Sequence, residues 1–341
     1  MKISLFLLGY GHVARRFAEL LHESEAALAA LGIEPVIVAV ASRRGGVAFD
    51  PDGVELGRLH SQPCDLPAIV GVLREMQRLP VRVLVETTTL SIEAGEPAIS
   101  HVRAALASGA HVITANKGPV AFAYRGLTDE AARAGVSFLF EGAVMDGVPV
   151  FGLIRDTMPA VQISGFRGVV NSTTNFILTA MEQGEPFQSA LERMQQAGVA
   201  EADPSLDIDG WDAAAKAAAL GNVLLDAGAT PVTVAREGIG PATATRAAAA
   251  RERGRRLKLV ASGTGRGPSA SLRVQLEELD ARDPLAILEG QANALELDTW
   301  PLGRVVITQR DGGLEKTAYA LLADLVTIVR RANRSIDRSV T

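Results

Sequence analysis

The sequence of 341 residues lacks several features that define large classes of protein. A single cysteine, Cys64, excludes an internal disulfide and a cysteine-based metal site. No apolar run approaches the roughly 20 residues of a membrane span, and the N-terminal run 3–9 ends in a glycine turn without a signal-peptide cleavage site. The formal net charge of −5 excludes a basic nucleic-acid surface over the whole protein. We therefore expect a soluble, cytoplasmic protein of about two domains, with neither a nucleic-acid nor a membrane partner.

Lysine and histidine are also scarce. Only 5 of the 34 basic residues are lysines, and a lysine amine can titrate and donate a proton where a guanidinium cannot. All 5 histidines lie at or before His111. A domain formed by the later part of the chain must therefore carry out acid–base chemistry without imidazole.

The first 145 residues alternate between strand and helix patterns. An apolar run at 3–8 is followed by a glycine turn, an amphipathic stretch over 14–31 and a β-branched run at 36–40. Further strands are predicted at 81–85, 111–114 and 137–140, with helices at 96–109 and 125–134. This order predicts a doubly wound α/β domain whose parallel sheet is covered on both faces.

The pattern changes after about residue 145. Strands are predicted at 161–171, 272–276, 294–298 and 304–308, and helices at 174–183, 186–197, 209–227 and 317–331, with further helical pattern over 231–251. The later part of the chain thus predicts a second domain that mixes strands and helices.

The glycine turn after the first strand matches the dinucleotide-binding fingerprint Gly-x-Gly-x-x-Ala, at Gly9, Gly11 and Ala14. The first glycine permits the tight turn, the second lets the backbone approach a pyrophosphate, and the small third residue allows helix packing. The pyrophosphate would lie at the helix N-terminus, where unpaired N–H groups favour anions. We expect the cofactor to contact Gly9, Gly11, His12 and Val13.

Cofactor specificity is expected at the end of the second strand. An NAD site usually has an acidic residue there for the ribose hydroxyls, whereas this chain has Ser42, Arg43 and Arg44. A hydroxyl and two guanidinium groups suit a 2′-phosphate, which predicts NADP(H) in preference to NAD(H). The alternative is a solvated loop that happens to be basic.

An acidic stretch, 201–216, is the most informative part of the later half. Asp212 and Lys216 lie four residues apart at the start of a predicted helix, and therefore on one face. An amine beside carboxylates stays protonated and can deliver a proton to an oxygen that develops negative charge. The alternative is structural, with Asp209 as a helix N-cap and Asp212–Lys216 as an ordinary surface ion pair.

Lys117 is a second candidate, in the segment Thr114-Ala115-Asn116-Lys117-Gly118-Pro119. The segment follows a predicted strand, and ligands of open α/β sheets bind at that carboxyl edge. The alternative is an ordinary exit turn with an exposed lysine.

The chain resembles the homoserine dehydrogenase family over nearly its whole length. The resemblance rests on five motifs in order: residues 9–14, 112–119, 141–149, 171–175 (Asn-Ser-Thr-Thr-Asn) and 200–216. It implies reversible NAD(P)H-dependent reduction of L-aspartate 4-semialdehyde to L-homoserine, within threonine and methionine biosynthesis. It also implies a Rossmann-type domain at 1–147 and 305–341, with an inserted α/β domain at 148–304 for substrate binding and dimerisation.

The resemblance also assigns roles to individual residues. Lys216 is implied as the proton donor to the aldehyde oxygen and Lys117 as a second catalytic lysine near the nicotinamide. The implied substrate-binding acids are Glu201, Asp207 and Asp212, Asp212 being counted with the catalytic residues as well. Cofactor contacts are implied at Ser42, Arg43, Thr88, Lys117, Gly198 and Gly313. Backbone oxygens of Glu141, Val144, Asp146 and Val148 resemble a monovalent cation site, usually for Na⁺, although a plain crossover turn would give the same sequence.

Two segments depart from the family pattern. Ser172 replaces a common glycine, and Gln309-Arg310-Asp311-Gly312-Gly313 replaces a familiar Gly-Pro-Gly-Ala-Gly at a cofactor contact. We expect a short form without a C-terminal regulatory domain. A related amino-acid dehydrogenase of the same fold and a non-catalytic NADP(H)-binding sensor are the alternatives, and retention of cofactor without turnover would favour the sensor.

Overall fold

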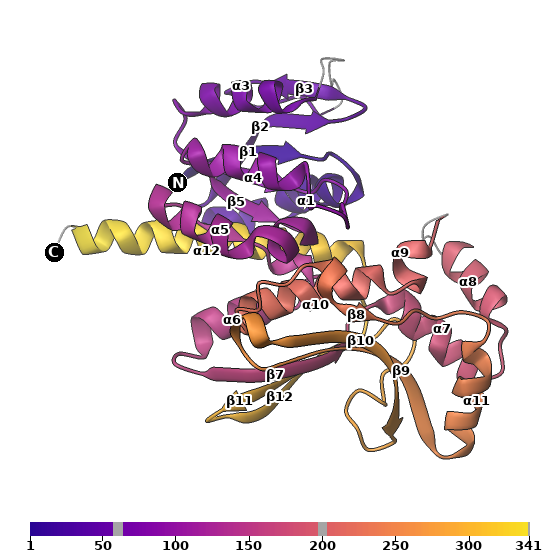
Figure 1. The fold of residues 1–341 in the computed structure, drawn as a ribbon. Coiled ribbons are helices and arrows are strands. Elements are labelled where there is room, and N and C mark those ends of the chain that lie inside the picture. The colour runs from indigo at the N-terminus through magenta and orange to yellow at the C-terminus, as the bar shows by residue number, and fades with distance from the viewer. Residues whose placement is uncertain (57–63, 197–202, 340–341) are drawn as a thin grey trace. The chain divides into compact units, whose positions relative to one another are not determined.

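The computed structural model describes residues 1–56, 64–196 and 203–339, with side chains up to residue 333 (Figure 1). It divides into two compact units, one made of residues 1–119, 123–151 and 314 onward, the other of residues 120–122 and 152–313. The return to the first unit lies at 314 and not at the expected 305, because β12 (Gly303–Gln309) pairs with β11 (Asn293–Trp300) in the sheet of the second unit. Among the described residues no helix is long and apolar enough to cross a membrane.

The first unit contains a six-stranded sheet. Its spatial order is β3 (Gly46–Phe49), β2 (Glu34–Ser42), β1 (Lys2–Leu8), β4 (Val81–Glu86), β5 (His111–Thr114) and β6 (Phe138–Leu139). All neighbours are parallel except β2 and β3, which form an antiparallel pair. Apart from that edge, this is the strand order of dinucleotide-binding domains, whose ligands bind where the order reverses, beside β1. The predicted Rossmann-type fold is confirmed.

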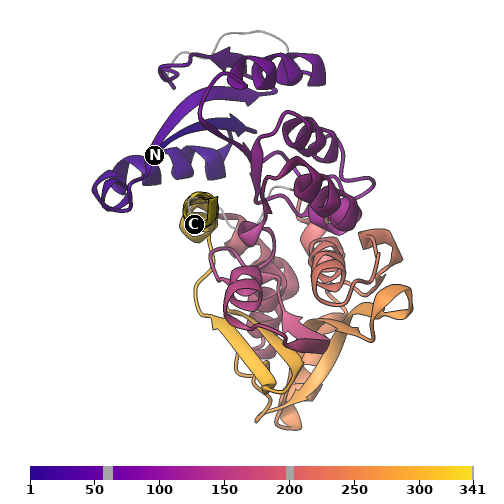
Figure 2. The same ribbon diagram turned by 90° about the vertical axis from the view of Figure 1, so that its left-hand side faces the viewer.

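Helices pack on this sheet because its strands are apolar on both faces. Residues 3–8 of β1 are all buried, as expected for a central parallel strand. The helices of the unit are α1 (His12–Glu23), α2 (Glu25–Ala30), α3 (Leu66–Met76), α4 (Ala98–Ala107), α5 (Lys117–Ala134) and α12 (Leu314–Ser339). In Figure 2, α12 is seen end-on beside α1. Leu321, Leu325 and Ile328 of α12 share one core with Phe17 of α1, so the C-terminal helix completes the first unit.

The second unit contains a mixed six-stranded sheet. Its order is β12, β11, β7 (Gln162–Val169), β9 (Arg255–Thr264), β10 (Ser271–Asp280) and β8 (Ala235–Arg236). Strand β9 was not predicted from the sequence, because it follows directly on the Ala/Arg-rich helix α11 (Thr243–Glu252) and begins with two arginines. The remaining helices are α6 (Val150–Thr157), through which the chain enters this unit, α7 (Ser172–Glu182), α8 (Phe187–Gln196), α9 (Ser205–Ile208) and α10 (Trp211–Leu224).

Helix α7 begins earlier than the sequence pattern indicates. The predicted strand 161–171 ends at Val169, and Asn171 caps α7 by accepting a hydrogen bond from Thr174 N at 2.8 Å. A polar cap directly after a strand competes with strand pairing, since the side chain satisfies a helix N–H that would otherwise be unpaired. The strand-to-helix turn therefore brings Asn171 to a strand end, where it contributes to the site described next.

Candidate active site

The glycine turn of the first unit has the geometry of a phosphate-binding turn. Gly9 has φ +92°, and a Cβ there would lie 2.6 Å from the Thr87 carbonyl carbon. A Cβ on Gly11 would meet no atom nearer than 3.9 Å, so the backbone is open on that side. Helix α1 starts at His12 with no side chain capping it. The turn and the uncapped helix N-terminus fit a dinucleotide pyrophosphate.

One of the predicted specificity residues, Ser42, ends β2, and the two arginines follow it. Ser42 accepts a hydrogen bond from Gly45 N at 2.9 Å, which closes the turn to β3. Arg43 and Arg44 in this turn are exposed. The structure thus places a hydroxyl and two guanidinium groups directly after the second strand.

A buried carboxyl, Glu86, organises the neighbouring strand ends. Glu86 is 0% exposed at the end of β4 and accepts hydrogen bonds from Thr114 Oγ1 at 2.7 Å, from Thr88 N at 2.8 Å and from the Thr88 hydroxyl. Burial raises the pKa of this carboxyl, while the hydrogen bonds from Thr88, Thr114 and Asn116 oppose the shift. The Thr87 hydroxyl donates to Gly9 O at 2.8 Å, which joins this network to the glycine turn.

The same hydrogen-bond network fixes the position of Lys117. Asn116 donates from Nδ2 to Thr88 O at 3.0 Å, and its Oδ1 accepts from Gly118 N at 2.9 Å as the N-cap of α5. Lys117 is therefore the first residue of α5, at the carboxyl edge of the sheet and half-buried. The structure brings Gly9, Thr88 and Lys117 to one edge of the first unit.

The second unit brings together three of the predicted site residues. Asp207 lies in α9, while Asp212 and Lys216 lie one turn apart on α10. Asn171 Nδ2 donates to Asp207 Oδ1 at 2.6 Å and to Asp212 Oδ2 at 2.9 Å. Lys216 Nζ lies 3.2 Å from Asp212 Oδ2 and donates to Val170 O at 2.6 Å. This cluster is the candidate substrate site.

The ion pair in this cluster is more than a surface pair. The side chains of Lys216 and Asp212 are 12% and 15% exposed, so water screens their attraction only weakly. Burial raises the pKa of Asp207, and the nearby Asp212 carboxylate raises it further, while hydrogen bonds from Asn171 and Thr173 and the charge of Lys216 lower it. The site therefore holds the Lys216 amine beside two carboxyl groups, of which Asp207 has a raised pKa.

The junction between α9 and α10 is held by its neighbours. Gly210, at φ +78°, joins the two helices, and a Cβ on it would lie 2.5 Å from Glu237 O. The Arg236 guanidinium lies 3.5 Å from the centre of the Trp211 ring and also donates to Asp209 O. These contacts fix the angle at which Asp207 and Asp212 approach Asn171.

The predicted cation loop follows β6 in the first unit. Glu141 is buried, donates from its backbone N to Asp324 Oδ2 at 2.9 Å and accepts at Oε1 from Phe151 N at 2.7 Å. Asp146 adopts φ +46° and accepts from Thr317 Oγ1 at 3.2 Å. Val148 O already accepts from Val150 N at 2.8 Å. The described residues contain no group of three or more His, Cys, Asp or Glu side chains suited to a metal ion, but the expected ligands here are backbone oxygens.

Two predicted contacts, Gly198 and Glu201, lie outside the described residues. Gly313, at φ +127°, directly precedes α12. In the departing segment before it, Gln309 is 7% exposed, and its Oε1 has no hydrogen-bond partner among the described residues.

Two family models match this chain. The homoserine dehydrogenase model matches residues 149–326, and the model of the homoserine dehydrogenase NAD-binding domain matches residues 9–141. The chain belongs to the homoserine dehydrogenase family. Members of this family are NAD(P)-dependent oxidoreductases that act on a CH–OH group of a small molecule. The cofactor of this protein is a nicotinamide dinucleotide.

Individual relatives match over nearly the full length. The chain is 33% identical to an NAD(+)-dependent homoserine dehydrogenase of Pseudomonas canavaninivorans, over 98% of this chain and 99% of the relative. It is 31% identical to a homoserine dehydrogenase of Methanocaldococcus jannaschii, over 96% and 98% of the two chains. A solved homoserine dehydrogenase of Thiobacillus denitrificans superposes with a TM-score of 0.82 at 29% identity, covering 98% of this chain and 74% of the other.

Sequence reasoning assigns no site role to Asn171, although it begins one of the family motifs, and none to the Val170 carbonyl or Glu86. Two sequence features point to them. Glu86 is an acid directly after the buried apolar residues 83–85 of its strand, and the polar run that starts at Asn171 closely follows another strand. Acids and amides at such strand ends are candidates for orienting neighbouring site residues.

Proposed function

We propose that this protein catalyses the reversible oxidation of L-homoserine to L-aspartate 4-semialdehyde with NADP(H). The observation that carries the proposal is the cluster of Lys216, Asp207 and Asp212 around Asn171. A chain of this family with a proton donor and two carboxyl groups in one partly buried cluster has the groups that this substrate needs. The substrate carries an α-ammonium, which carboxylates bind, and a carbonyl or hydroxyl oxygen, which exchanges a proton.

Lys216 is assigned the proton transfer. In the reducing direction the Lys216 ammonium gives a proton to the aldehyde oxygen as that oxygen becomes an alkoxide, and the amine is left neutral. In the oxidising direction the neutral amine takes the proton of the hydroxyl group. Val170 O accepts a hydrogen bond from Lys216 Nζ and the Asp212 carboxylate forms an ion pair with it, and both contacts orient the amine for this step.

Asp207, Asp212 and Glu201 are assigned to the substrate. Carboxylates hold the α-ammonium of homoserine by charge-assisted hydrogen bonds. Asn171 supports this role, because its amide donates to both Asp207 and Asp212 and offsets the repulsion between them.

The pyrophosphate of the cofactor is assigned to the glycine turn of the first unit. Gly9, Gly11, His12 and Val13 would hold the pyrophosphate, and Thr88, Lys117, Gly198 and Gly313 are further proposed contacts. When bound, the nicotinamide supplies the hydride chemistry that the protein's own side chains lack. Lys117, at the start of α5, is proposed as the second catalytic lysine.

NADP(H) is the proposed preference over NAD(H). Ser42, Arg43 and Arg44 support it, since they offer a hydroxyl and two guanidinium groups where a 2′-phosphate would bind. The Pseudomonas canavaninivorans relative is named as NAD(+)-dependent. Family membership therefore does not decide the cofactor preference. The ratio of kcat/KM for NADP(H) over NAD(H) tests whether the loop after β2 in this chain selects NADP(H).

A monovalent cation such as Na⁺ is proposed at the loop of Glu141, Val144, Asp146 and Val148. The supporting features are an oxygen-rich, largely buried loop and the left-handed backbone at Asp146. Hard cations of this kind prefer oxygen ligands. Activity in Na⁺ compared with a bulky organic cation at equal ionic strength tests this assignment.

We further propose a cytoplasmic homodimer. The edge hairpin β11–β12 supports dimerisation, because Trp300, Leu302 and Val306 are 66%, 57% and 40% exposed there. Light scattering of the wild type and of Trp300→Glu tests the dimer, and cell fractionation tests the location.

The test of the reaction is turnover of defined substrates. L-Homoserine is expected to reduce NADP⁺, as followed by NADPH absorbance, while L-serine and L-threonine react far more slowly. Equal rates with several hydroxy amino acids would favour a related dehydrogenase. Tight NADPH binding without any turnover would favour a sensor.

A further inference from the structure

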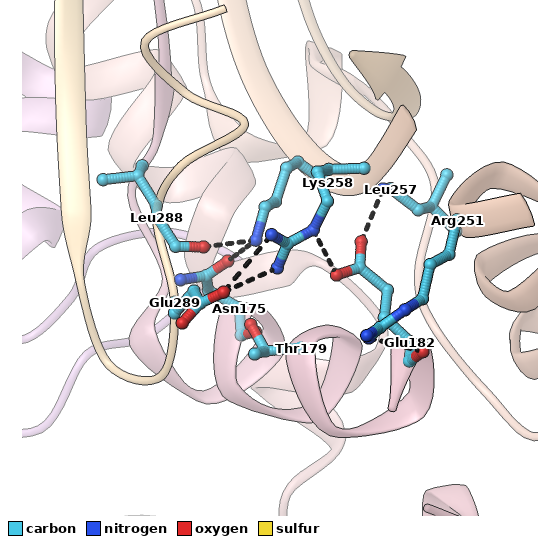
Figure 3. A network of polar contacts seen from close by, with 9 residues as sticks. Asn175, Thr179, Glu182, Arg251, Leu257, Lys258, Leu288 and Glu289 are labelled. Atoms are coloured by element: carbon cyan, nitrogen blue, oxygen red, sulfur yellow. Dashed lines mark hydrogen bonds and ion pairs between the residues drawn. The ribbon is translucent and has the colours of Figure 1, made fainter. Parts of the chain in front are cut away.

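Lys258 is a buried lysine that the proposed reaction does not use. It lies in β9 and is 0% exposed. Its Nζ donates to Asn175 Oδ1 at 2.9 Å and to Leu288 O, as Figure 3 shows. Burying an amine is costly even when it is hydrogen-bonded. An apolar side chain could fill the same space without this desolvation cost. The two hydrogen bonds that Lys258 donates therefore need an explanation.

These acceptors join the segment 288–293 to helix α7. Because Asn175 Oδ1 accepts from Lys258, its Nδ2 faces the carbonyl oxygens of Gly290 and Ala292, both at 3.0 Å. Asn293 Nδ2 adds a hydrogen bond of 2.9 Å to Ser172 Oγ. The first turns of α7 are thus attached to this segment through Lys258 and two amide side chains.

The same strand also holds the other end of α7. Glu182, the last residue of the helix, accepts from Leu257 N at 2.8 Å (Figure 3). It also accepts from Arg256 Nε at 2.6 Å. Three consecutive residues of β9 therefore fix α7 at two points about two turns apart. A helix attached twice to a sheet can neither slide nor rotate without breaking one of the attachments.

The N-terminus of α7 is where this restraint reaches the substrate cluster. Asn171 caps the helix and donates to both Asp207 and Asp212, and the preceding carbonyl of Val170 accepts from Lys216. Hydrogen bonds of 2.6 to 2.9 Å leave little tolerance, since a shift of α7 by a few tenths of an ångström would lengthen them.

We propose that Lys258 is a positioning residue for the substrate cluster, acting through Asn175 and the segment 288–293 to hold α7 and, with it, Asn171. The proposal rests on the proposed function, in which Asp207 and Asp212 bind homoserine. The hydrogen bonds of Lys258 go to Asn175 and Leu288 and not to either of those carboxylates, so its effect on the reaction is indirect.

The positioning role does not require Lys258 to stay charged. Burial lowers the pKa of its ammonium to about 8, Glu182 and Glu289 opposing this shift and Arg256 adding to it. A neutral amine still has two N–H donors for the two acceptors, Asn175 Oδ1 and Leu288 O. We therefore expect α7 to be disturbed when the N–H donors of Lys258 are removed by substitution, but not when the amine loses its charge.

The test compares wild type, Lys258→Met, Asn175→Ala and the double variant, with Lys2→Met as the control at an exposed lysine. Lys258→Met is expected to raise KM for homoserine about 10-fold and to lower kcat/KM by about 10- to 100-fold. The Kd for NADPH should stay within about 2-fold of wild type, because neither Lys258 nor α7 is among the proposed cofactor contacts. Asn175→Ala should give the same pattern, and the double variant should be no worse than the stronger single variant.

Each outcome decides the proposal. Folded Lys258→Met and Asn175→Ala with wild-type KM and kcat would overturn it, as would fully additive losses in the double variant. If Lys258→Met does not fold, Asn175→Ala carries the same expectation. Absence of homoserine turnover by the wild type would overturn the proposed function together with this role, whereas turnover with unaffected variants would overturn this role alone.

Discussion

The stability of the second unit should depend on pH through Lys258. Burial lowers the pKa of its ammonium from an ordinary 10.5 to about 8. Between these values the amine is neutral in the folded protein and protonated in the unfolded chain, so the unfolded state binds more protons. The free energy of unfolding therefore rises as the pH increases across this window. When the pH falls again, this gain decreases and is fully lost once the pH is below about 8.

The size of the effect follows from the shift. At 1.36 kcal/mol per pKa unit, lowering the pKa from 10.5 to about 8 makes the folded state about 3 kcal/mol less stable below the window than above it. Between about pH 7.5 and about pH 9.5 the same linkage gives an increase of about 2 kcal/mol. Lys258→Met has no titrating group at this position, so the increase should be absent.

Urea unfolding at these two pH values, for wild type and Lys258→Met, measures the effect. The contributions of other titrating groups are shared by the two proteins and cancel in the difference between them. Lys2→Met, changed at an exposed lysine, should keep the wild-type dependence, and Lys258→Gln replaces the methionine variant if that one does not fold. Equal pH dependence in wild type and in the Lys258 variant would refute the reasoning.

Three other substitutions test the two parts of the site. Gly9→Ala should raise the Kd for NADPH by at least about 10-fold, because its Cβ would lie 2.6 Å from the Thr87 carbonyl carbon; unchanged affinity in a binding titration would contradict the assigned phosphate turn. Asn171→Asp keeps the helix cap but places a third carboxylate between Asp207 and Asp212, so kcat/KM for homoserine should fall about 100-fold with little change in melting temperature; a rate near wild type would contradict the support role. Arg43→Ala should lower the ratio of kcat/KM for NADPH over NADH about 10-fold, and a constant ratio in steady-state kinetics would remove Arg43 from cofactor recognition.

The parallel sheet of the first unit was predictable because its strands are short apolar runs separated by helices and a glycine turn. The same pattern located Gly9, where only a backbone without Cβ fits beside Thr87, and Gly11, whose backbone is open on the side of its missing Cβ. The pair Asp212–Lys216 was predictable from helical spacing alone.

The remaining features depend on contacts that are distant in sequence. Strand β9 was missed because Arg255, Arg256 and Lys258 break its apolar pattern, yet each has a partner from another element. Glu86 receives its partners from the loop after β4 and from Thr114 at the end of β5, and Asn171 meets carboxylates 36 and 41 residues away. Neither composition nor periodicity encodes such pairings, which appear only once the strand ends are assembled.

The most direct test of the account is homoserine oxidation by Lys216→Ala beside the wild type and Lys2→Ala. Loss of the proton donor should lower kcat by about 10²- to 10⁴-fold, while the Kd for NADPH stays at the wild-type value because Lys216 is not among the proposed cofactor contacts. Lys2→Ala should retain wild-type kcat. A Lys216→Ala protein that is folded, binds NADPH and oxidises homoserine at the wild-type rate would contradict the central claim that Lys216 transfers the proton.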